Sequence, residues 1–331
     1  MTDPLLEIRG LTTSFPGASG GASGRVPVVD GIDLAITRGE ALALVGESGC
    51  GKSMTALSIL RLVPKPGRIE PGSSIRFAGE DLLSLPITEM RRMRGDRVAM
   101  IFQEPMSSLN PVESVGRQVV EAIRLHERVT RAEAQKRVET LFERVRIPDP
   151  RASFHAYPHQ LSGGLRQRVM IAMAVAMSPE LLIADEPTTA VDVTVQAQIL
   201  ELLTELRRDL GTALLLITHD LGVVNELADR VAVMYAGEIV ERGDRREILS
   251  GAQHPYTQGL MRSMPSLAAP DERLQEIEGV VPAPADWPRG CRFSTRCPRV
   301  FEPCRETAPS DRDFSASHRA RCHALTAEAE A

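Results

Sequence analysis

The sequence has no apolar run long enough to cross a membrane. Its longest run, from Val169 to Met177, is about half of the ~20 residues that a membrane-spanning helix needs. The first residues, Met-Thr-Asp-Pro-Leu-Leu-Glu, have neither the basic nor the apolar segment of a secretory signal peptide. We therefore expect a cytosolic chain without a transmembrane helix, whose contact with any membrane depends on a partner.

A surplus of basic residues is also absent. The 39 Lys and Arg residues stand against 44 Asp and Glu residues, which gives a net charge of -5. Proteins that track phosphate backbones usually carry a basic surplus, so the composition does not favour nucleic acid as a partner. The chain shows no internal repeat at solenoid or propeller periods. Its 331 residues suffice for one large domain with an appendage, or for two domains.

Cysteine is scarce until the last part of the chain. Cys50 stands alone, whereas the other four residues of this type lie close to the C-terminus: Cys291, Cys297, Cys304 and Cys322. In a reducing cytosol, such a group suggests a metal before disulfide bonds. Its wide spacing matches neither common ferredoxin pattern, and structural zinc usually has closer pairs. The residues alone leave open an iron–sulfur cluster, unliganded thiols, or zinc with His318 or His323 replacing one cysteine.

The pattern of apolar residues predicts an α/β fold. A first group of strands is expected at Leu5 to Ile8 and Val28 to Ile36, and buried strands at Ala41 to Val45, Leu181 to Ala184 and Ala213 to Ile217. Helices are expected at about 51–62 and around Ile199, Leu202, Leu203 and Leu206. Alternation of buried strands with helices predicts a parallel sheet core that is covered on both faces.

The chain divides into two domains by composition. Residues 1–250 form the larger domain, with an antiparallel β subdomain, an α-helical insert at about 104–177, and a hairpin of Arg230 to Tyr235 with Glu238 to Glu241. After about Gly251 the composition shifts towards proline and arginine and the periodicity fades. Residues 251–331 are therefore predicted to be a small C-terminal extension that is loosely packed or held by metal.

A phosphate-binding loop follows the strand that ends at Val45. The residues Gly46, Glu47, Ser48, Gly49, Cys50, Gly51, Lys52 and Ser53 fit Gly-x-x-x-x-Gly-Lys-Ser between a strand and a helix. Their backbone N–H groups are expected to wrap the β-phosphate at the positive end of that helix. Lys52 would neutralise phosphate charge, the Ser53 hydroxyl would bind Mg²⁺, and Met54 completes the predicted nucleotide site.

Two carboxylates follow the apolar strand at Leu181 to Ala184. Asp185 suits Mg²⁺, through water, and Glu186 would activate the attacking water as general base. Gln103, where the sheet gives way to the helical insert, is placed to touch Mg²⁺ and the water. His219, after a buried strand, is placed to bond the γ-phosphate. These side chains would complete a hydrolytic site at the carboxyl ends of the strands.

A second phosphate-binding helix N-terminus is predicted at Ser162, Gly163 and Gly164. They lie within Leu161-Ser162-Gly163-Gly164-Leu165-Arg166-Gln167-Arg168 and precede a helix that runs to about Met177. The free N–H groups and the dipole at such an end favour an anion. One chain therefore carries two phosphate-binding helix ends.

The order of these landmarks resembles the nucleotide-binding domain of ABC transporters, with Phe15 before the phosphate loop and Asp192 after Glu186. The resemblance covers about residues 5 to 250 and implies an ATPase that uses ATP and Mg²⁺. It implies a head-to-tail dimer with an identical or homologous ATPase subunit, in which the Leu161–Arg168 segment of one subunit completes the ATP site of the other. It further implies that Phe15 stacks on adenine, that Asp192 lies at the subunit contact, and that the insert grips a transmembrane partner.

Further segments resemble the oligopeptide, dipeptide and nickel importers of this family. They are Glu104-Pro105-Met106-Ser107-Ser108-Leu109-Asn110-Pro111, His254-Pro255-Tyr256-Thr257 with Leu260 following, and the cysteine-bearing tail. This resemblance implies a subunit that powers import of di- and oligopeptides, with two permease subunits and an extracytoplasmic substrate-binding protein. It implies a peripheral position on the cytoplasmic face of the inner membrane. Some members hold a [4Fe–4S] cluster on four tail cysteines.

The chain departs from the family pattern at two positions. The sequence also leaves two alternative functions to consider. Phe15 replaces the commoner tyrosine, and Leu165 stands where many members have glutamine. Nickel or oligosaccharide cargo would use the same ATPase subunit. A soluble ABC ATPase of DNA repair or translation is disfavoured, because this chain has one such domain, no long heptad run and no basic surplus.

Overall fold

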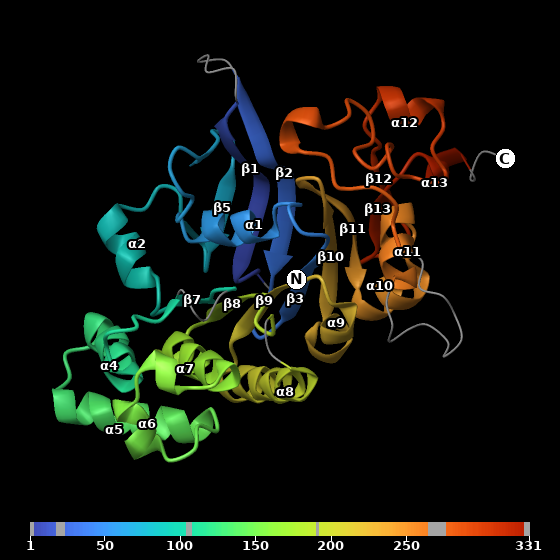
Figure 1. Ribbon diagram of the computed structural model, residues 1–331. Coiled ribbons are helices and arrows are strands. Elements are labelled where there is room, and N and C mark those ends of the chain that lie inside the picture. The colour runs from blue at the N-terminus through green and yellow to red at the C-terminus, as the bar shows by residue number, and fades with distance from the viewer. Residues whose placement is uncertain (1–2, 18–23, 104–107, 190–191, 264–275, 328–331) are drawn as a thin grey trace. The chain divides into compact units, whose positions relative to one another are not determined.

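The computed structural model describes residues 3–17, 24–103, 108–189, 192–263 and 276–327, and its backbone is shown in Figure 1. Glu104 to Ser107, part of the importer-like segment, lies outside these ranges. The chain forms two compact units. The first unit comprises Met1–Ile36, Ala41–Leu83 and Ile217–Ala331, and the second comprises Thr37–Glu40 and Ser84–Leu216.

The first unit contains an antiparallel sheet of the order β2-β1-β5-β6, with β4 also paired to β1. Its strands are β1 (Leu6–Pro16), β2 (Arg25–Ile36), β4 (Arg68–Ile69), β5 (Ser74–Phe77) and β6 (Glu80–Asp81). The strand that was expected to end at Ile8 continues to Pro16, because register shifts between Ile8 and Leu11 absorb the exposed Arg9-Gly10 pair. Gly10 has a φ of 55°, which suits glycine.

A second sheet of the first unit runs in the order β12-β13-β11-β10-β3. Its strands are β3 (Ala41–Val45), β10 (Arg230–Tyr235), β11 (Glu238–Asp244), β12 (Asp311–Asp313) and β13 (Arg319–Arg321). β3 is parallel to β10, and every residue of β3 is buried, as expected for an apolar strand inside a parallel sheet. The tail adds β12 and β13 to the edge at β11, so part of the extension is more ordered than its composition suggests.

Helices of the first unit follow its strands and fill its C-terminal part. They are α1 (Lys52–Ile59), α9 (Leu221–Leu227), α10 (Arg245–Gly251), α11 (Pro255–Arg262), α12 (Glu302–Glu306) and α13 (Ala324–Ala327), with the short 3₁₀ helix η2 (Pro284–Asp286). α1 begins directly after the glycine-rich loop at the end of β3. This placement gives the strand, loop and helix order that a phosphate loop requires.

The second unit joins a small sheet to a group of helices. Its strands are β7 (Val98–Ile101), β8 (Leu181–Asp185) and β9 (Ala213–Thr218), whose last residues pass into the first unit. β7 and β8 are parallel, and β8 is buried throughout. The helices are α2 (Ile87–Met93), α4 (Val115–His126), α5 (Arg131–Arg144), α6 (Pro150–His155), α7 (Gly163–Val175) and α8 (Val193–Leu210), with η1 (Pro158–Gln160).

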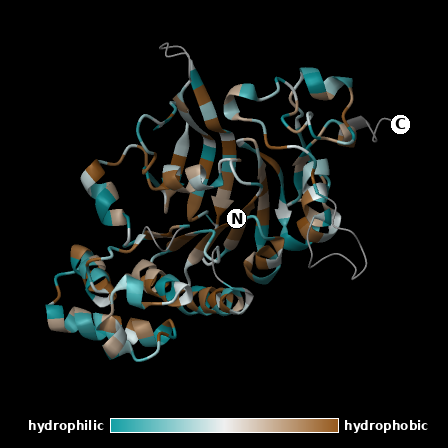
Figure 2. Ribbon diagram, in the orientation of Figure 1, coloured by the Kyte–Doolittle hydropathy of each residue, from teal (hydrophilic) through white to brown (hydrophobic). Residues whose placement is uncertain are grey.

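Amphipathic sequence explains the helices of the second unit. Thr130 and Glu133 form a capping box at the start of α5, and Val138 and Phe142 on its apolar face are fully buried. Hydrophilic and hydrophobic residues alternate along α5 and α8 in Figure 2. Over the described ranges, no helix combines the length and the apolarity that crossing a bilayer requires.

Candidate functional site

The glycines of the phosphate loop are needed because the backbone is crowded. Gly46 has a φ of 155°, and a Cβ atom there would lie 2.2 Å from the carbonyl oxygen of Met234 on β10. Gly51 has a φ of 107°, and its Cβ would lie 2.6 Å from the carbonyl oxygen of Val28 on β2. Any larger residue at either position would therefore have to move main-chain atoms. The sheet itself thus fixes the path of the loop.

Lys52 is held inside the phosphate loop. Its side chain is only 5% exposed, and Nζ donates to the carbonyl oxygens of Gly46 at 2.7 Å and Glu47 at 2.9 Å. Cys50 is fully buried beside it, and burial raises the pKa of its thiol, so Cys50 is a neutral packing residue. Ser48 and Gly49 are exposed, and Ser53 and Met54 are half-buried.

The N-terminus of α1 is left for an anion. Gly51 is its N-cap residue, no side chain among the described residues caps it, and its first turn contains no acidic residue. Its first N–H groups are therefore not satisfied by a side chain, as at other phosphate-binding helix ends. An uncapped helix end of this kind suits an anion.

The second unit brings Gln103 and Glu186 together. Gln103 Nε2 donates to Glu186 Oε2 at 3.1 Å, and Thr189 Oγ1 donates to the same oxygen at 2.9 Å. Glu186 has a φ of 46°, a left-handed conformation that is uncommon for this residue type. Asp185, at the end of β8, is 4% exposed. Two carboxylates and an amide thus stand at the ends of β7 and β8, where ligands bind in α/β proteins.

Ser162 caps α7, and the glycines after it have different surroundings. Ser162 Oγ accepts from the N–H of Leu165 at 3.3 Å, and both Ser162 and Gly163 are exposed. Gly164 faces α8, because a Cβ atom there would lie 2.7 Å from Cγ1 of Val195. The helix end is therefore open to a ligand at Gly163 and closed by packing at Gly164.

The two arginines of the same segment are structural. Arg166 Nε donates to the carbonyl oxygen of Pro158 at 2.6 Å. Arg168 is buried and donates to the carbonyl oxygen of Val145 at 2.8 Å and to Gln198 at 2.9 Å. Burial lowers the pKa of Arg168. Both guanidinium groups therefore bond to other parts of the same unit.

The remaining predicted site residues lie at element ends. Phe15, near the end of β1, is half-buried and packs over Gly67, where a Cβ atom would lie 2.5 Å from its ring. Asp192 is exposed and caps α8 by accepting from the N–H of Val195 at 2.9 Å. His219 is exposed directly after β9. The first unit thus holds Phe15, the phosphate loop and His219, and the second holds the other predicted nucleotide-site residues.

All four tail cysteines line one cavity of the first unit. Cys304 and Cys322 are buried, Cys291 and Cys297 are half-buried, and Phe293, Arg299 and His323 line the same cavity. Burial raises the pKa values of the Cys297 and Cys322 thiols, and raises that of Cys291 to about 12. None of these cysteines is in a disulfide bond. Residues far apart in the sequence are thus brought to one place.

Neither the expected iron–sulfur cluster nor the zinc alternative is supported by the arrangement of the described side chains. Among them, no group of three or more His, Cys, Asp or Glu side chains is arranged to hold a metal ion. His318 is not a spare ligand, because its Nε2 lies 2.7 Å from Oε1 of the buried Glu241. His323 Nε2 lies 2.8 Å from the carbonyl oxygen of Thr307, to which it donates.

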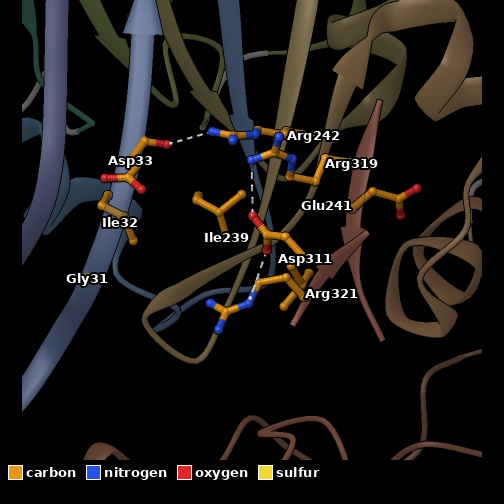
Figure 3. Close-up of a pocket in the computed structure, with 10 residues that line it drawn as sticks. Gly31, Ile32, Asp33, Ile239, Glu241, Arg242, Asp311, Arg319 and Arg321 are labelled. Carbon is orange, nitrogen blue, oxygen red and sulfur yellow. Dashed lines mark hydrogen bonds and ion pairs between the residues drawn. The ribbon is translucent and has the colours of Figure 1, made fainter. Parts of the chain in front are cut away.

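A second cavity of the first unit is lined largely by charged residues beside the tail hairpin of β12 and β13. It is lined by residues of β2, β11, β12 and β13 (Figure 3). Arg319 and Arg321 on β13 each pair with Asp311 on β12, and Arg242 Nη1 donates to the carbonyl oxygen of Asp33 at 3.5 Å. The Asp311 pairs therefore join β12 to β13, whereas the hairpin is held to β11 by strand pairing and by the ion pair of Arg321 with Glu238 at 3.1 Å.

Two residues that contact the phosphate loop could not be assigned from the sequence. The N–H of Glu47 donates to Oη of Tyr256 at 2.9 Å, and the Glu47 carboxylate pairs with Arg296 at 3.0 Å. Tyr256 belongs to the His254-Pro255-Tyr256-Thr257 segment, which marks the importer branch without indicating a contact. Arg296 precedes Cys297, and no local pattern around it points to the loop.

Comparison with known proteins identifies both parts of the chain. Residues 29–189 match the family model described as ABC transporter, and residues 240–304 match the oligopeptide/dipeptide transporter C-terminal region. The probable peptide ABC transporter ATP-binding protein of Sinorhizobium fredii is 50% identical over 97% of this chain and 95% of its own length. The dipeptide transport ATP-binding protein of Escherichia coli is 46% identical, over 96% of each chain.

Solved structures show the same fold. A dimeric ATP-binding cassette, bound to ADP and phosphate in a post-hydrolysis state, has a TM-score of 0.64 at 24% identity and covers 73% of this chain and 99% of its own. The cbiO1 subunit of a Clostridium perfringens ABC transporter complex has a TM-score of 0.62 at 27% identity, with 76% and 92% covered. The resemblance inferred from the sequence is thereby confirmed: the chain belongs to the ABC transporter family and, within it, to the ATP-binding proteins of peptide transport.

Proposed function

We propose that this chain binds and hydrolyses ATP to power the import of di- and oligopeptides through membrane partners. The observation that carries the proposal is the phosphate loop with its uncapped helix end, in a chain whose relatives of 46–50% identity are named as ATP-binding proteins of peptide transport. Residues 1–250 would form the ATPase domain and residues 251–331 the extension. The helical insert would contact two permease subunits at the cytoplasmic face of the inner membrane, and an extracytoplasmic binding protein would deliver the cargo on the other side.

ATP would bind first at the phosphate loop. Phe15 would stack on adenine, and the N–H groups from Gly46 to Ser53 would surround the β-phosphate. Lys52 is already inside the loop, so it can exchange its carbonyl acceptors for phosphate oxygens without a large movement. The Ser53 hydroxyl and Asp185 suit Mg²⁺, a cation that prefers oxygen ligands and neutralises charge on the phosphates when bound.

Hydrolysis would depend on Glu186. Its carboxylate is oriented by Gln103 and Thr189, which leaves it placed as a base for a water molecule. His219 would bond the γ-phosphate. Most of the catalysis of phosphoryl transfer comes from positioning and charge stabilisation, and these residues supply both.

The second half of each ATP site would come from another ATPase subunit. Ser162 and Gly163 are exposed at a helix end, where Ser162 caps α7 by accepting from the N–H of Leu165. In a head-to-tail dimer they would meet the γ-phosphate held by the partner's loop, with Asp192 at the contact. The partner subunit would be a second copy or a homologous chain.

The four cysteines would hold a [4Fe–4S] cluster. The support for this proposal is that all four thiols line one cavity and that four thiols are the donor set such a cluster takes. Burial raises the pKa values of the Cys291, Cys297 and Cys322 thiols, so binding of iron would release their protons, and the positive charge of the iron would stabilise the thiolates. Anaerobic purification followed by iron and acid-labile sulfide analysis tests this. A colourless protein with zinc or without metal would refute it.

The cargo is proposed from the relatives of this chain rather than from its ATP-site residues. Nickel or oligosaccharide import would use the same ATPase chemistry, and the residues described here face ATP rather than cargo. Peptides are favoured because the relatives that match nearly the whole chain are named for peptide or dipeptide transport. Those names do not favour a role in DNA repair or translation.

Lys52→Ala tests the proposal most simply. The variant removes the only side-chain cation inside the loop region that the structure describes, and we expect ATP turnover to fall below detection. Lys136→Ala is the matched control, because Lys136 is an exposed lysine on α5. Hydrolysis by the purified chain and uptake of labelled dipeptides by cells that carry each variant are the measurements. Normal turnover with Lys52→Ala would refute the assignment of the loop.

A further inference from the structure

The C-terminal extension contacts the phosphate loop of its own chain at two atoms of one residue. Tyr256 Oη, on α11, accepts the N–H of Glu47 at 2.9 Å. Arg296 Nη1, from the loop between Cys291 and Cys297, lies 3.0 Å from Glu47 Oε1. The backbone and the side chain of Glu47 are thus both held by residues outside the ATPase domain.

Arg296 is fixed before it reaches Glu47. Its side chain is 4% exposed, Nε donates to the carbonyl oxygen of Glu278 at 2.9 Å, and Nη2 donates to that of Ile277 at 3.1 Å. The guanidinium also lies 5.8 Å from the centre of the Tyr235 ring. A planar group bound on several edges presents its remaining N–H in one direction, which a lysine ammonium could not do.

Tyr256 is fixed by packing. It is fully buried against Tyr235 and Phe293, with ring centres 4.6 and 5.4 Å away. Its N–H donates to Nδ1 of the buried His254 at 3.1 Å. Burial lowers the pKa of His254 to about 3, so the ring is neutral and can accept this bond. The Tyr256 hydroxyl is therefore a rigid acceptor for the loop.

Charge explains why the loop needs this support. Glu47 places a carboxylate within a loop that receives a triphosphate, and like charges repel. Arg296 pairs with that carboxylate at 3.0 Å and so neutralises its charge. Tyr256 fixes the peptide that follows Gly46, so less conformational freedom is lost when the phosphates bind.

We propose that Arg296 and Tyr256 are positioning residues of the ATP site, through which the cysteine-bearing extension sets the affinity of the phosphate loop for Mg-ATP. The proposal rests on the proposed ATP-binding function. Phe293 joins the two regions, because it lines the cysteine cavity and packs on Tyr256 and Tyr235. A change at the cysteines that moves the 291–297 loop therefore also moves Arg296. Because such coupling is reciprocal, nucleotide binding at the phosphate loop should in turn restrain the 291–297 loop.

The test is the dissociation constant for a fluorescent ATP analogue with Mg²⁺, measured on the full chain. Arg296→Gln leaves Glu47 uncompensated, and we expect affinity to fall about tenfold. Glu47→Gln in the same chain removes the repulsion, so the double variant should return to within about threefold of the wild type. Tyr256→Phe keeps the packing, loses only the hydroxyl, and should weaken binding about threefold to tenfold.

Arg319→Gln is the control, because it makes the same change of charge at an ion-paired arginine of the extension that pairs with Asp311 and Asp313 rather than with the loop. Its affinity should stay within about twofold of the wild type. Equal affinities for Arg296→Gln and the wild type, or no recovery in the double variant, would overturn the proposal. A wild-type chain that fails to bind ATP would instead refute the proposed function, and this inference with it.

Hydrogen exchange supplies a readout that a merely structural role would not change. Saturating Mg-ATP should slow exchange in the 291–297 segment of the wild type, and should leave it unchanged in Arg296→Gln. Two results would contradict the coupling between the phosphate loop and the 291–297 segment. One is an exchange rate in the wild type that does not change with ATP, and the other is equal slowing in the wild type and in Arg296→Gln.

Discussion

The two helix ends that suit a phosphate, at α1 and at α7, are built in opposite ways. The loop before α1 is enclosed: Lys52 is buried, its ammonium bonds to loop carbonyls, and two glycines touch neighbouring strands. The end of α7 is open: Ser162 and Gly163 are exposed, and Ser162 caps the helix with its own side chain. One end encloses a cation, and the other is exposed at the surface.

This difference predicts that nucleotide binding depends on the α1 end and that hydrolysis depends also on the α7 end. An enclosed loop with a cation inside can bind the nucleotide within its own chain. An exposed, capped helix end offers only a few N–H groups, so it gains a ligand when another molecule presents one. Substitutions at the α1 end should therefore affect binding, and substitutions at the α7 end should affect the steps that follow binding.

The largest effect that separates binding from chemistry is expected for Glu186→Gln. The amide cannot act as a base, so turnover should fall about 10²–10⁴-fold while the affinity for ATP stays within about threefold. Hydrolysis rates and nucleotide binding should be measured side by side, with Glu121→Gln on the exposed face of α4 as control. Unchanged hydrolysis would remove Glu186 as the base.

Alanine substitutions of Gly46 and Gly164 should differ in their effects on stability and on ATP affinity. Gly46→Ala forces a Cβ against the backbone oxygen of Met234, so we expect a loss of about 2–4 kcal/mol of stability and of most ATP affinity. Gly164→Ala meets only side-chain atoms of Val195, with Cγ1 closest at 2.7 Å, and no backbone atom, so a smaller loss of about 1 kcal/mol is expected with ATP affinity retained. Urea unfolding checks both. Equal destabilisation would contradict the claim that the two glycines differ.

Acid should weaken the bracing of the phosphate loop through His254. Its pKa of about 3 in the folded chain lies below the value near 6.5 of an unfolded chain, so below pH 6.5 only the unfolded state takes up this proton. Stability is therefore full above pH 6.5 and is lost at up to about 1.4 kcal/mol per pH unit on acidification. His254→Asn keeps a capping acceptor without this proton, so its unfolding free energy should fall less steeply between pH 6.5 and 5. Parallel pH profiles would contradict the prediction.

The smallest effect is expected at the cap of α7. Ser162→Ala removes the acceptor for the N–H of Leu165, which should reduce stability by about 1 kcal/mol. ATP affinity should not change, because this end lies outside the loop that binds first. Thermal unfolding with and without Mg-ATP measures both quantities. A loss of ATP affinity equal to that in Lys52→Ala would show that α7 belongs to the primary binding site.

The sequence predicts the phosphate loop well because its chemistry is local. Eight consecutive residues contain the donors, the cation and the glycines, and the strand and helix beside them are plain from apolar patterns. Gln103 and Glu186 are harder, since their bond at 3.1 Å depends on the pairing of β7 with β8. Motif order nevertheless led to both.

Several features of the C-terminal extension could not be predicted from the sequence. The order of β12 and β13 was missed because strands of three residues carry almost no periodic signal. The contacts of Tyr256 and Arg296 with Glu47 join residues that are more than two hundred positions apart in the sequence. No local sequence pattern at Glu47, Tyr256 or Arg296 indicates its partner. His318 was considered as a metal ligand, whereas burial beside Glu241 gives it a structural partner.

Nucleotide affinity and turnover of Gly163→Asp test the central claim most directly. An aspartate in the first turn favours the helix, so α7 should stay folded, but its charge repels a phosphate at that end. We predict that Gly163→Asp binds Mg-ATP like the wild type and loses hydrolysis, whereas Lys52→Ala loses binding itself. Loss of ATP affinity in the isolated Gly163→Asp chain, or wild-type hydrolysis by it, would contradict a site divided between the loop of one subunit and the helix end of another.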